Sequence, residues 1–163
     1  SPDHRLGLDG YLEMEGLVYR FTPVKNPNNS IYPRLNIEKM IKNITQTDDI
    51  NTIIKTSDDY TNIINHDAGI YRYRNLNNPD VFLSIESQRL VQNYRSSFLQ
   101  IANDLIEDPS NNSLVNDILI QMENYFPIDI IEIYSPDMQN YIAELFNMVG
   151  NTRMYNRYKI SSE

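Results

Sequence analysis

Two glutamates separated by one methionine stand near the start of the chain, and their local structure decides whether they can act together. In a helix, the side chains of Glu13 and Glu15 would diverge, because residues two apart do not face each other. On a strand, both carboxylates would lie on one face and could form the paired-acid site of general acid–base catalysis. The other interpretation is a solvated charged face, so the pair by itself does not establish an enzyme.

Histidine and acidic residues elsewhere give little sign of metal or nucleophilic chemistry. His4 lies in a polar N-terminal segment, and neither it nor His66 shows the spacing of a metal-binding motif. Asp67 could orient His66 as a base, but no serine stands in a nucleophile-elbow context. The acidic clusters at 48–49 and 57–59 lack the calcium-loop pattern and suit helix caps. We therefore expect no catalytic residue, no metal site and no cofactor.

A Tyr-Arg-Tyr-Arg run is the clearest candidate for ligand binding. If this run forms a strand, alternation places Tyr71 and Tyr73 on one face and Arg72 and Arg74 on the other. Tyrosine stacks on ligands and arginine pairs with oxyanions, so the run could bind a sugar, a peptide or an anionic headgroup. The alternative interpretation is a half-buried edge strand whose charges face water.

Short and mixed elements must position these residues in the N-terminal half. After Gly16, apolar and polar residues alternate with a period of two, which predicts a strand or extended segment. Residues 45–70 predict two short helices or an irregular excursion. Asn36 is a good N-cap for a short helix with apolar residues at helical spacing, namely Ile37, Met40, Ile41 and Ile44.

The C-terminal half has the regular pattern of helices. Ser135 at an N-cap, Pro136 at the first helical position and Gly150 after the last turn match the chemistry of helix ends. Four helices are expected, from Ser84 to about Glu107, then up to Phe126, from Pro136 to Gly150, and over Thr152–Lys159. Their apolar stripes predict a core of Leu90, Tyr94, Phe98, Ile101, Leu105, Leu114, Ile118, Met122, Ile142, Leu145 and Phe146.

Two segments of this half resemble each other. IANDLIEDPSNNSLVNDIL, from Ile101, lies over IAELFNMVGNTRMYNRYKI, from Ile142, and both predict a helix, a turn and a helix. Such a repeat is typical of stacked tetratricopeptide-like hairpins, although two copies also arise by coincidence in helical proteins. We predict a mainly α fold, α+β overall, in a single domain over residues 1–163. Residues 1–83 would mix helix, strand and loop, and residues 84–163 would hold the helical hairpins.

The composition excludes several classes of partner. A net charge of −8 over 163 residues argues against nucleic-acid binding, which depends on many Lys and Arg side chains facing phosphates. The one modest basic cluster, Arg153, Arg157 and Lys159, is interleaved with tyrosines and also suits a helix C-terminus. No apolar run reaches the length of a membrane span, so we expect no membrane insertion by these residues. Cysteine is absent, which excludes disulfides and thiolate sites.

Three segments point, in order, to a known family: LDGYLEMEGLVYRFTPVK, RLNIEKM and NLNNPDVFLSIESQRLVQNYRSSFLQIANDLIE. They resemble the C-terminal region of large multi-spanning membrane proteins from Bacteroidota, a family long catalogued as a domain of unknown function. These proteins are similar to protein O-mannosyltransferases. The resemblance covers residues 5–42 and 73–156, whereas 43–72 departs from the family pattern.

The resemblance implies a membrane-embedded region that transfers sugar from a lipid-linked donor to exported protein. It also implies a tetratricopeptide-like tail outside the bilayer, tethered to the inner membrane on the periplasmic side. The family's catalytic acidic residues lie near its first membrane spans, and none of that portion is present here. The expected role is therefore non-catalytic: protein interaction, acceptor presentation or structural support.

The resemblance also bears on the partners of the chain. They would be the membrane-embedded region of the same chain or another protein, with a glycan or an acceptor peptide as further candidates. The alternative is a small independent carbohydrate-binding or hydrolytic protein that uses the acidic pairs and the Tyr-Arg run.

Overall fold

The computed structural model describes residues 8–26, 33–45, 71 and 73–160. The chain divides into two units, Ser1–Tyr71 and Arg72–Glu163. The sequence predicts the change from mixed to helical character between residues 83 and 84, which is twelve residues after the boundary of the two units. Apart from Thr45, the predicted short helices or excursion over 45–70 lie outside the described residues.

The first unit contains a small sheet and a helix. These elements are η2 (Asp9–Tyr11), β1 (Leu12–Met14), β2 (Tyr19–Phe21), β3 (Arg34–Leu35) and α1 (Ile37–Thr45). Strand β1 lies in the middle of the sheet, antiparallel to β2 and parallel to β3. Asn36 caps α1 as predicted, because its Oδ1 accepts a hydrogen bond of 3.1 Å from Lys39 N. Met14, Met40 and Ile44 are buried.

Gly16 turns the chain between β1 and β2. Its φ of +143° lies in a region that residues with a side chain rarely adopt. A Cβ at this position would also lie only 2.7 Å from Cε2 of Tyr71. The Tyr71 hydroxyl accepts a hydrogen bond of 2.9 Å from Leu17 N, so the tyrosine ring holds the turn from one side. Strand β2 confirms the extended segment that alternation predicted after Gly16.

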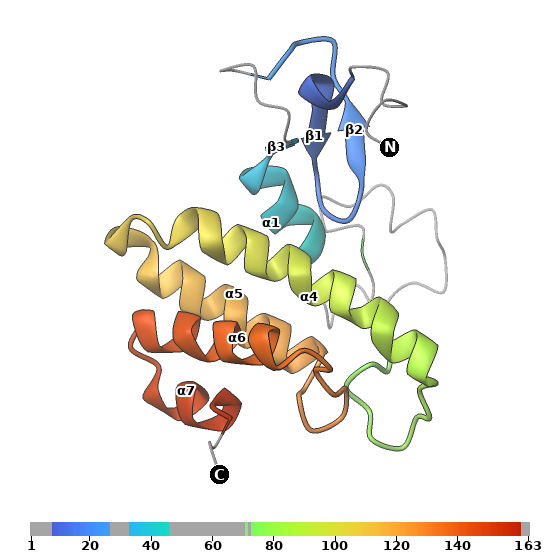
Figure 1. Ribbon diagram of the computed structural model, residues 1–163, viewed down its shortest axis with the longest axis vertical. Helices are drawn as coiled ribbons and strands as arrows, with labels where there is room; N and C mark the ends of the chain where they lie inside the picture. Colours follow the sequence, from blue (N-terminus) through green and yellow to red (C-terminus); the bar gives the residue numbers. More distant parts are fainter. Residues whose placement is uncertain (1–7, 27–32, 46–70, 72, 161–163) are drawn as a thin grey trace, which may run out of the picture. The chain divides into compact units, whose positions relative to one another are not determined.

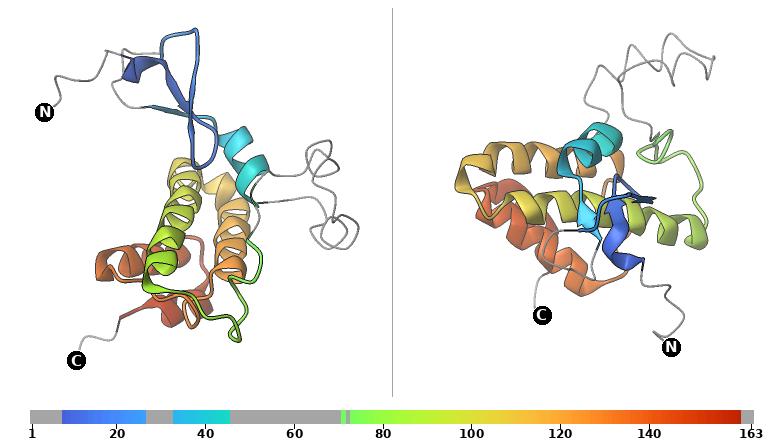
Figure 2. Two further views of the ribbon diagram at one scale, coloured as in Figure 1. Left: turned by 90° about the vertical axis from the view of Figure 1, so that its right-hand side faces the viewer. Right: turned by 90° about the horizontal axis from the view of Figure 1, so that it is seen from above.

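Helices make up most of the second unit, and each packs chiefly against its neighbour in the chain. They are α4 (Ile85–Leu105), η4 (Pro109–Asn111), α5 (Asn112–Tyr125), α6 (Pro136–Met148) and α7 (Thr152–Tyr158). Helices α4 and α5 run side by side in opposite directions, and α6 and α7 follow beyond α5 (Figures 1 and 2).

The described elements confirm a mainly α fold with a small sheet, α+β overall. The tetratricopeptide-like packing of the hairpins stays a prediction. Across the described ranges of the chain, none of the helices combines the length and the apolar composition that a membrane span requires.

The helix ends confirm the expected capping chemistry. Ser84 Oγ accepts a hydrogen bond of 3.2 Å from Ser87 N at the start of α4. Ser135 Oγ accepts one of 3.3 Å from Met138 N at the start of α6. Gly150 follows α6 with a φ of +80°, the conformation that favours glycine after a helix.

Most of the predicted core is buried. The confirmed residues are Phe98, Ile101, Ile118, Met122, Ile142, Leu145 and Phe146. Tyr94 and Leu105 are only half-buried. The helical periodicity therefore identified the right helices and, for α6, the right face.

Two predicted core residues are wrong, since Leu90 is 63% exposed and Leu114 is 41% exposed. In the first half of α4, Val91 and the charged Arg95 take the buried positions next to Leu90 and Tyr94, so hydrophobic periodicity was one residue off there. In α5, Val115 takes the buried position next to Leu114.

Arg95 is fully buried and organises the connection between α5 and α6. Its Nη2 donates hydrogen bonds to the carbonyls of Phe126 and Ile131, at 2.7 and 2.6 Å. Its Nη1 donates to Gln92 Oε1 at 3.0 Å and to the Glu132 carbonyl at 3.4 Å. These carbonyls belong to the end of α5 and the loop that follows, where no backbone N–H of a further helical turn is present to donate to them. Burial lowers the pKa of Arg95, because the charged form loses its water.

Replacing Phe98 by alanine should lower the free energy of unfolding by about 3–5 kcal/mol, because the ring has no exposed surface. Leu90→Ala in the same helix should change it by less than about 0.5 kcal/mol, since that side chain is largely exposed. Urea unfolding followed by circular dichroism measures both. Equal effects of the two substitutions would contradict the assigned face of α4.

Candidate functional site

The Tyr-Arg run does not form a strand where it is described, and its two tyrosines have different surroundings. Tyr71 is half-buried against Gly16, Arg74 is exposed in a turn, and Arg72 lies outside the described residues. Tyr73 is only 7% exposed and is surrounded by the rings of Tyr94, Tyr125 and Phe126, with centroids 5.4, 4.8 and 4.9 Å away. The enclosed Tyr73 ring cannot stack on a ligand in this arrangement, so the run does not define the candidate site. Ligand binding by the run stays a prediction.

Glu13 and Glu15 do come together, at β1 and the residue just after it. Lys39 Nζ lies 2.5 Å from Glu15 Oε1 and 3.9 Å from Glu13 Oε1. The buried Glu13 also pairs with Arg34 and accepts a hydrogen bond of 2.7 Å from Asn36. The strand interpretation of the pair therefore agrees with the geometry, and the carboxylates connect β1 to β3 and α1.

Cations hold Glu15 in its ionised form. The hydrogen bond from Lys39 lowers the pKa of Glu15, and a second one from Arg20, at 3.2 Å, acts in the same direction. A general acid at neutral pH needs a raised pKa, so this carboxylate suits an ion-pair network better than proton donation.

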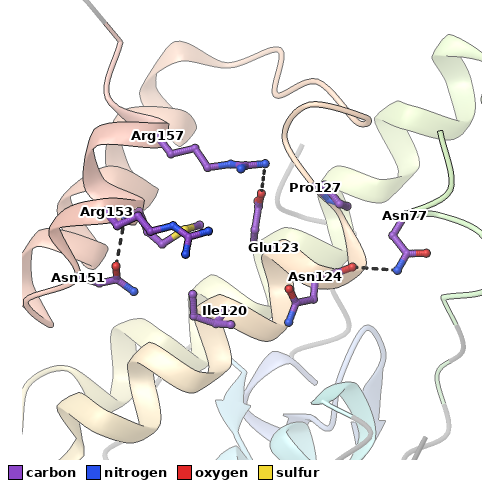
Figure 3. Close-up of a pocket in the computed structure, with 9 residues that line it drawn as sticks. Asn77, Ile120, Glu123, Asn124, Pro127, Asn151, Arg153 and Arg157 are labelled. Carbon is purple, nitrogen blue, oxygen red and sulfur yellow. Dashed lines mark hydrogen bonds and ion pairs between the residues drawn. The ribbon is translucent and has the colours of Figure 1, made fainter. Parts of the chain in front are cut away.

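The second unit contains a polar pocket of about 560 Å³ between α5 and α7. Figure 3 shows side chains from both helices, together with Asn77, directed toward this space. Its polar lining consists of Asn77, Glu123, Asn124, Asn151, Arg153 and Arg157. The pocket thus gathers two guanidinium groups, one carboxylate and three amides from segments far apart in the sequence.

Glu123 links α5 to α7 at this pocket. Its Oε2 accepts a hydrogen bond from the Tyr158 hydroxyl, and its Oε1 lies 2.8 Å from Arg157 Nη2. Burial raises the pKa of Glu123, and burial followed by the Glu123 charge raises the pKa of Tyr158. Tyr158 therefore stays protonated and donates. Arg157 also pairs with Asp129 at 2.7 Å, so two carboxylates neutralise this guanidinium.

Arg153 lies one helical turn before Arg157 and is exposed. Figure 3 shows its side chain extending from α7 toward α5. Among the residues that the structure describes, no carboxylate pairs with it. Nearby, Asn77 Nδ2 donates to the backbone carbonyl of Asn124 at 3.2 Å, and Asn124 itself lines the pocket. The pocket therefore offers an uncompensated positive charge beside neutral amides.

The sequence revealed only a portion of this site. Arg153, Arg157 and Lys159 stood out as a basic cluster, and a helix C-terminus was one interpretation of them. In the structure, Arg157 and Lys159 do lie at the end of α7, with Lys159 Nζ 5.5 Å from the centre of the Tyr155 ring. Glu123 carried no signal, because its partner Tyr158 is 35 residues away on another helix.

The remaining candidates for chemistry add no site. His4, His66 and the acidic clusters at 48–49 and 57–59 lie outside the described residues. In the ranges that are described, no group of three His, Asp or Glu side chains is arranged to hold a metal ion. Searches against family models, curated proteins and solved structures found no match to this chain.

The buried carboxyl of Glu123 predicts a pH-dependent stability. Because its pKa is raised in the folded state, its favourable contribution is complete below the ordinary value of 4.5 and is lost as the pH rises through the raised pKa. The difference in unfolding free energy between the wild type and Glu123→Gln should therefore fall with rising pH. Urea titrations at several pH values measure this difference. A difference that grows with pH would mean that the Arg157 ion pair outweighs burial.

Proposed function

We propose that this chain is a non-catalytic binding module of a membrane glycosyltransferase-like protein, with a role in protein interaction or acceptor presentation. The observation that carries the proposal is the polar pocket between α5 and α7, where Arg153 is left without a carboxylate partner in the described ranges of the chain. Ile120, Pro127 and Met154 complete the lining, and a combination of apolar walls with a few convergent polar groups is the usual form of a ligand pocket.

The state of the ionisable groups favours binding over catalysis. Glu123 has the raised pKa of a possible acid, but its Oε2 accepts a hydrogen bond from Tyr158 and its Oε1 is buried in an ion pair with Arg157. A carboxyl held in this way anchors α7 to α5, and it is not placed to transfer a proton to a substrate. The pairs of Glu13 and Glu15 with cations argue in the same direction, against the alternative of an independent hydrolase.

The sequence resemblance alone supports the assignment to a larger membrane protein. The resemblance supports a periplasmic tail that is tethered to the inner membrane, beside a region that transfers sugar to exported protein. Acceptor proteins of such a transferase would pass the tail as extended chains, and a pocket for peptide side chains would retain them near the membrane. Support of the membrane-embedded region would be a second role of the same surface.

Binding of the purified chain to peptide and glycan arrays tests this proposal. We expect peptide binding that Arg153→Ala reduces and that Arg89→Ala leaves unchanged, because Arg89 is an exposed arginine on α4 outside the pocket lining. The double substitution Arg72→Ala, Arg74→Ala tests the Tyr-Arg run in the same assay. Absence of binding to every array member, or sugar transfer or hydrolysis by the purified chain, would contradict the proposal.

A further inference from the structure

We propose that the pocket between α5 and α7 binds a carboxylate of an acidic peptide, with Arg153 as the principal contact. This inference rests on the proposed binding function and specifies the chemical class of the ligand. Its basis is the difference in surroundings between two arginines that lie one turn apart on the same helix.

Arg157 is occupied and Arg153 is available. Arg157 Nη2 lies 2.8 Å from Glu123 Oε1 and 2.7 Å from Asp129 Oδ2, so its charge is already neutralised. Arg153 has no such partner among the described residues, although it lines the same pocket. Its planar guanidinium presents paired N–H donors that match the two oxygens of a carboxylate.

The charge of the lining favours an anion. Glu123 and Asp129 offset the charge of Arg157, so Arg153 is the one cation of the lining that no carboxylate of the described residues offsets, in a chain whose net charge is −8. A local positive site on an acidic surface attracts a single carboxylate, whereas the field of the whole chain repels a polyanion. This balance favours an acidic side chain or a free C-terminus over a nucleic acid.

Neutral amides beside Arg153 favour a peptide as the carrier of that carboxylate. Asn77 and Asn124 lie on the pocket wall, where their amides can donate to and accept from a peptide backbone. Asn151 is more constrained, because its Oδ1 accepts from Met154 N at 3.2 Å and its Nδ2 donates to Asn116 Oδ1 at 2.7 Å. Asn77 already donates from Nδ2 to the Asn124 carbonyl, so its remaining polar capacity, the Asn124 amide and the Arg153 guanidinium together fit an extended acidic segment.

Fluorescence-anisotropy titrations of the purified chain test the inference with matched synthetic peptides. One series ends in a free Asp or Glu, a second carries the same sequences with an amidated C-terminus, and a third replaces Asp and Glu by Asn and Gln. Each series is measured against the wild type, Arg153→Ala, Arg153→Lys and the control Arg89→Ala. Circular dichroism melting establishes that the variants keep the fold, as expected for exposed residues.

We expect acidic peptides to bind the wild type, with a Kd about tenfold or more higher for their neutral counterparts and for Arg153→Ala. Arg153→Lys should restore some of the affinity, because it keeps the charge and loses the paired donors. Arg89→Ala should leave the Kd unchanged.

Each other outcome overturns the inference in a distinguishable way. If acidic and neutral peptides bind equally and Arg153→Ala has no effect, the chain binds peptides by another surface. The inferred carboxylate contact is then wrong, whereas the proposed binding function still holds. If Arg89→Ala weakens binding as much as Arg153→Ala, the attraction is a general surface effect. If no peptide of any series binds the wild type, the proposed binding function fails together with the inference.

Discussion

The second unit depends on the buried guanidinium of Arg95. It gathers carbonyls from the end of α5 and from the following loop, which would otherwise be buried without donors. Removing one side of such a contact leaves polar groups without partners, which costs more than the contact itself contributes. Arg95 therefore fixes the path by which the chain leaves α5 and enters α6, and this path allows α7 to return to α5.

The pocket follows from the contact between those two helices. Glu123 at the end of α5 receives Tyr158 and Arg157 from α7, so one carboxylate fixes a helix of only seven residues. Such a short helix has little stability of its own, and tertiary contacts must hold it. Because Arg157 is used for this contact, Arg153 one turn earlier can serve recognition. Under the proposed function, Arg157 supports the structure and Arg153 binds the ligand.

The sequence predicted what local chemistry determines. The caps at Asn36, Ser84 and Ser135 were predictable, because a side chain and a backbone amide three residues later suffice to form them. In α4, Phe98 and Ile101 were predicted correctly, but the first half of the buried face was predicted one residue off, since a periodicity of apolar residues assigns no buried place to Arg95. The pocket could not be predicted from the sequence, because the pairing of Glu123 with α7 depends on tertiary packing. The arginines were visible as a cluster, but nothing in their spacing showed which one is neutralised.

The most direct test of the account is an amide NMR titration of the purified chain with an acidic peptide. It reports which residues change their environment and requires no substitution. We predict shift changes concentrated around Asn124 on α5 and Arg153 on α7, with the first unit unaffected. Changes confined to residues 71–74 or to the sheet, or the absence of any change at saturating peptide, would contradict the claim that the α5–α7 pocket is the functional site.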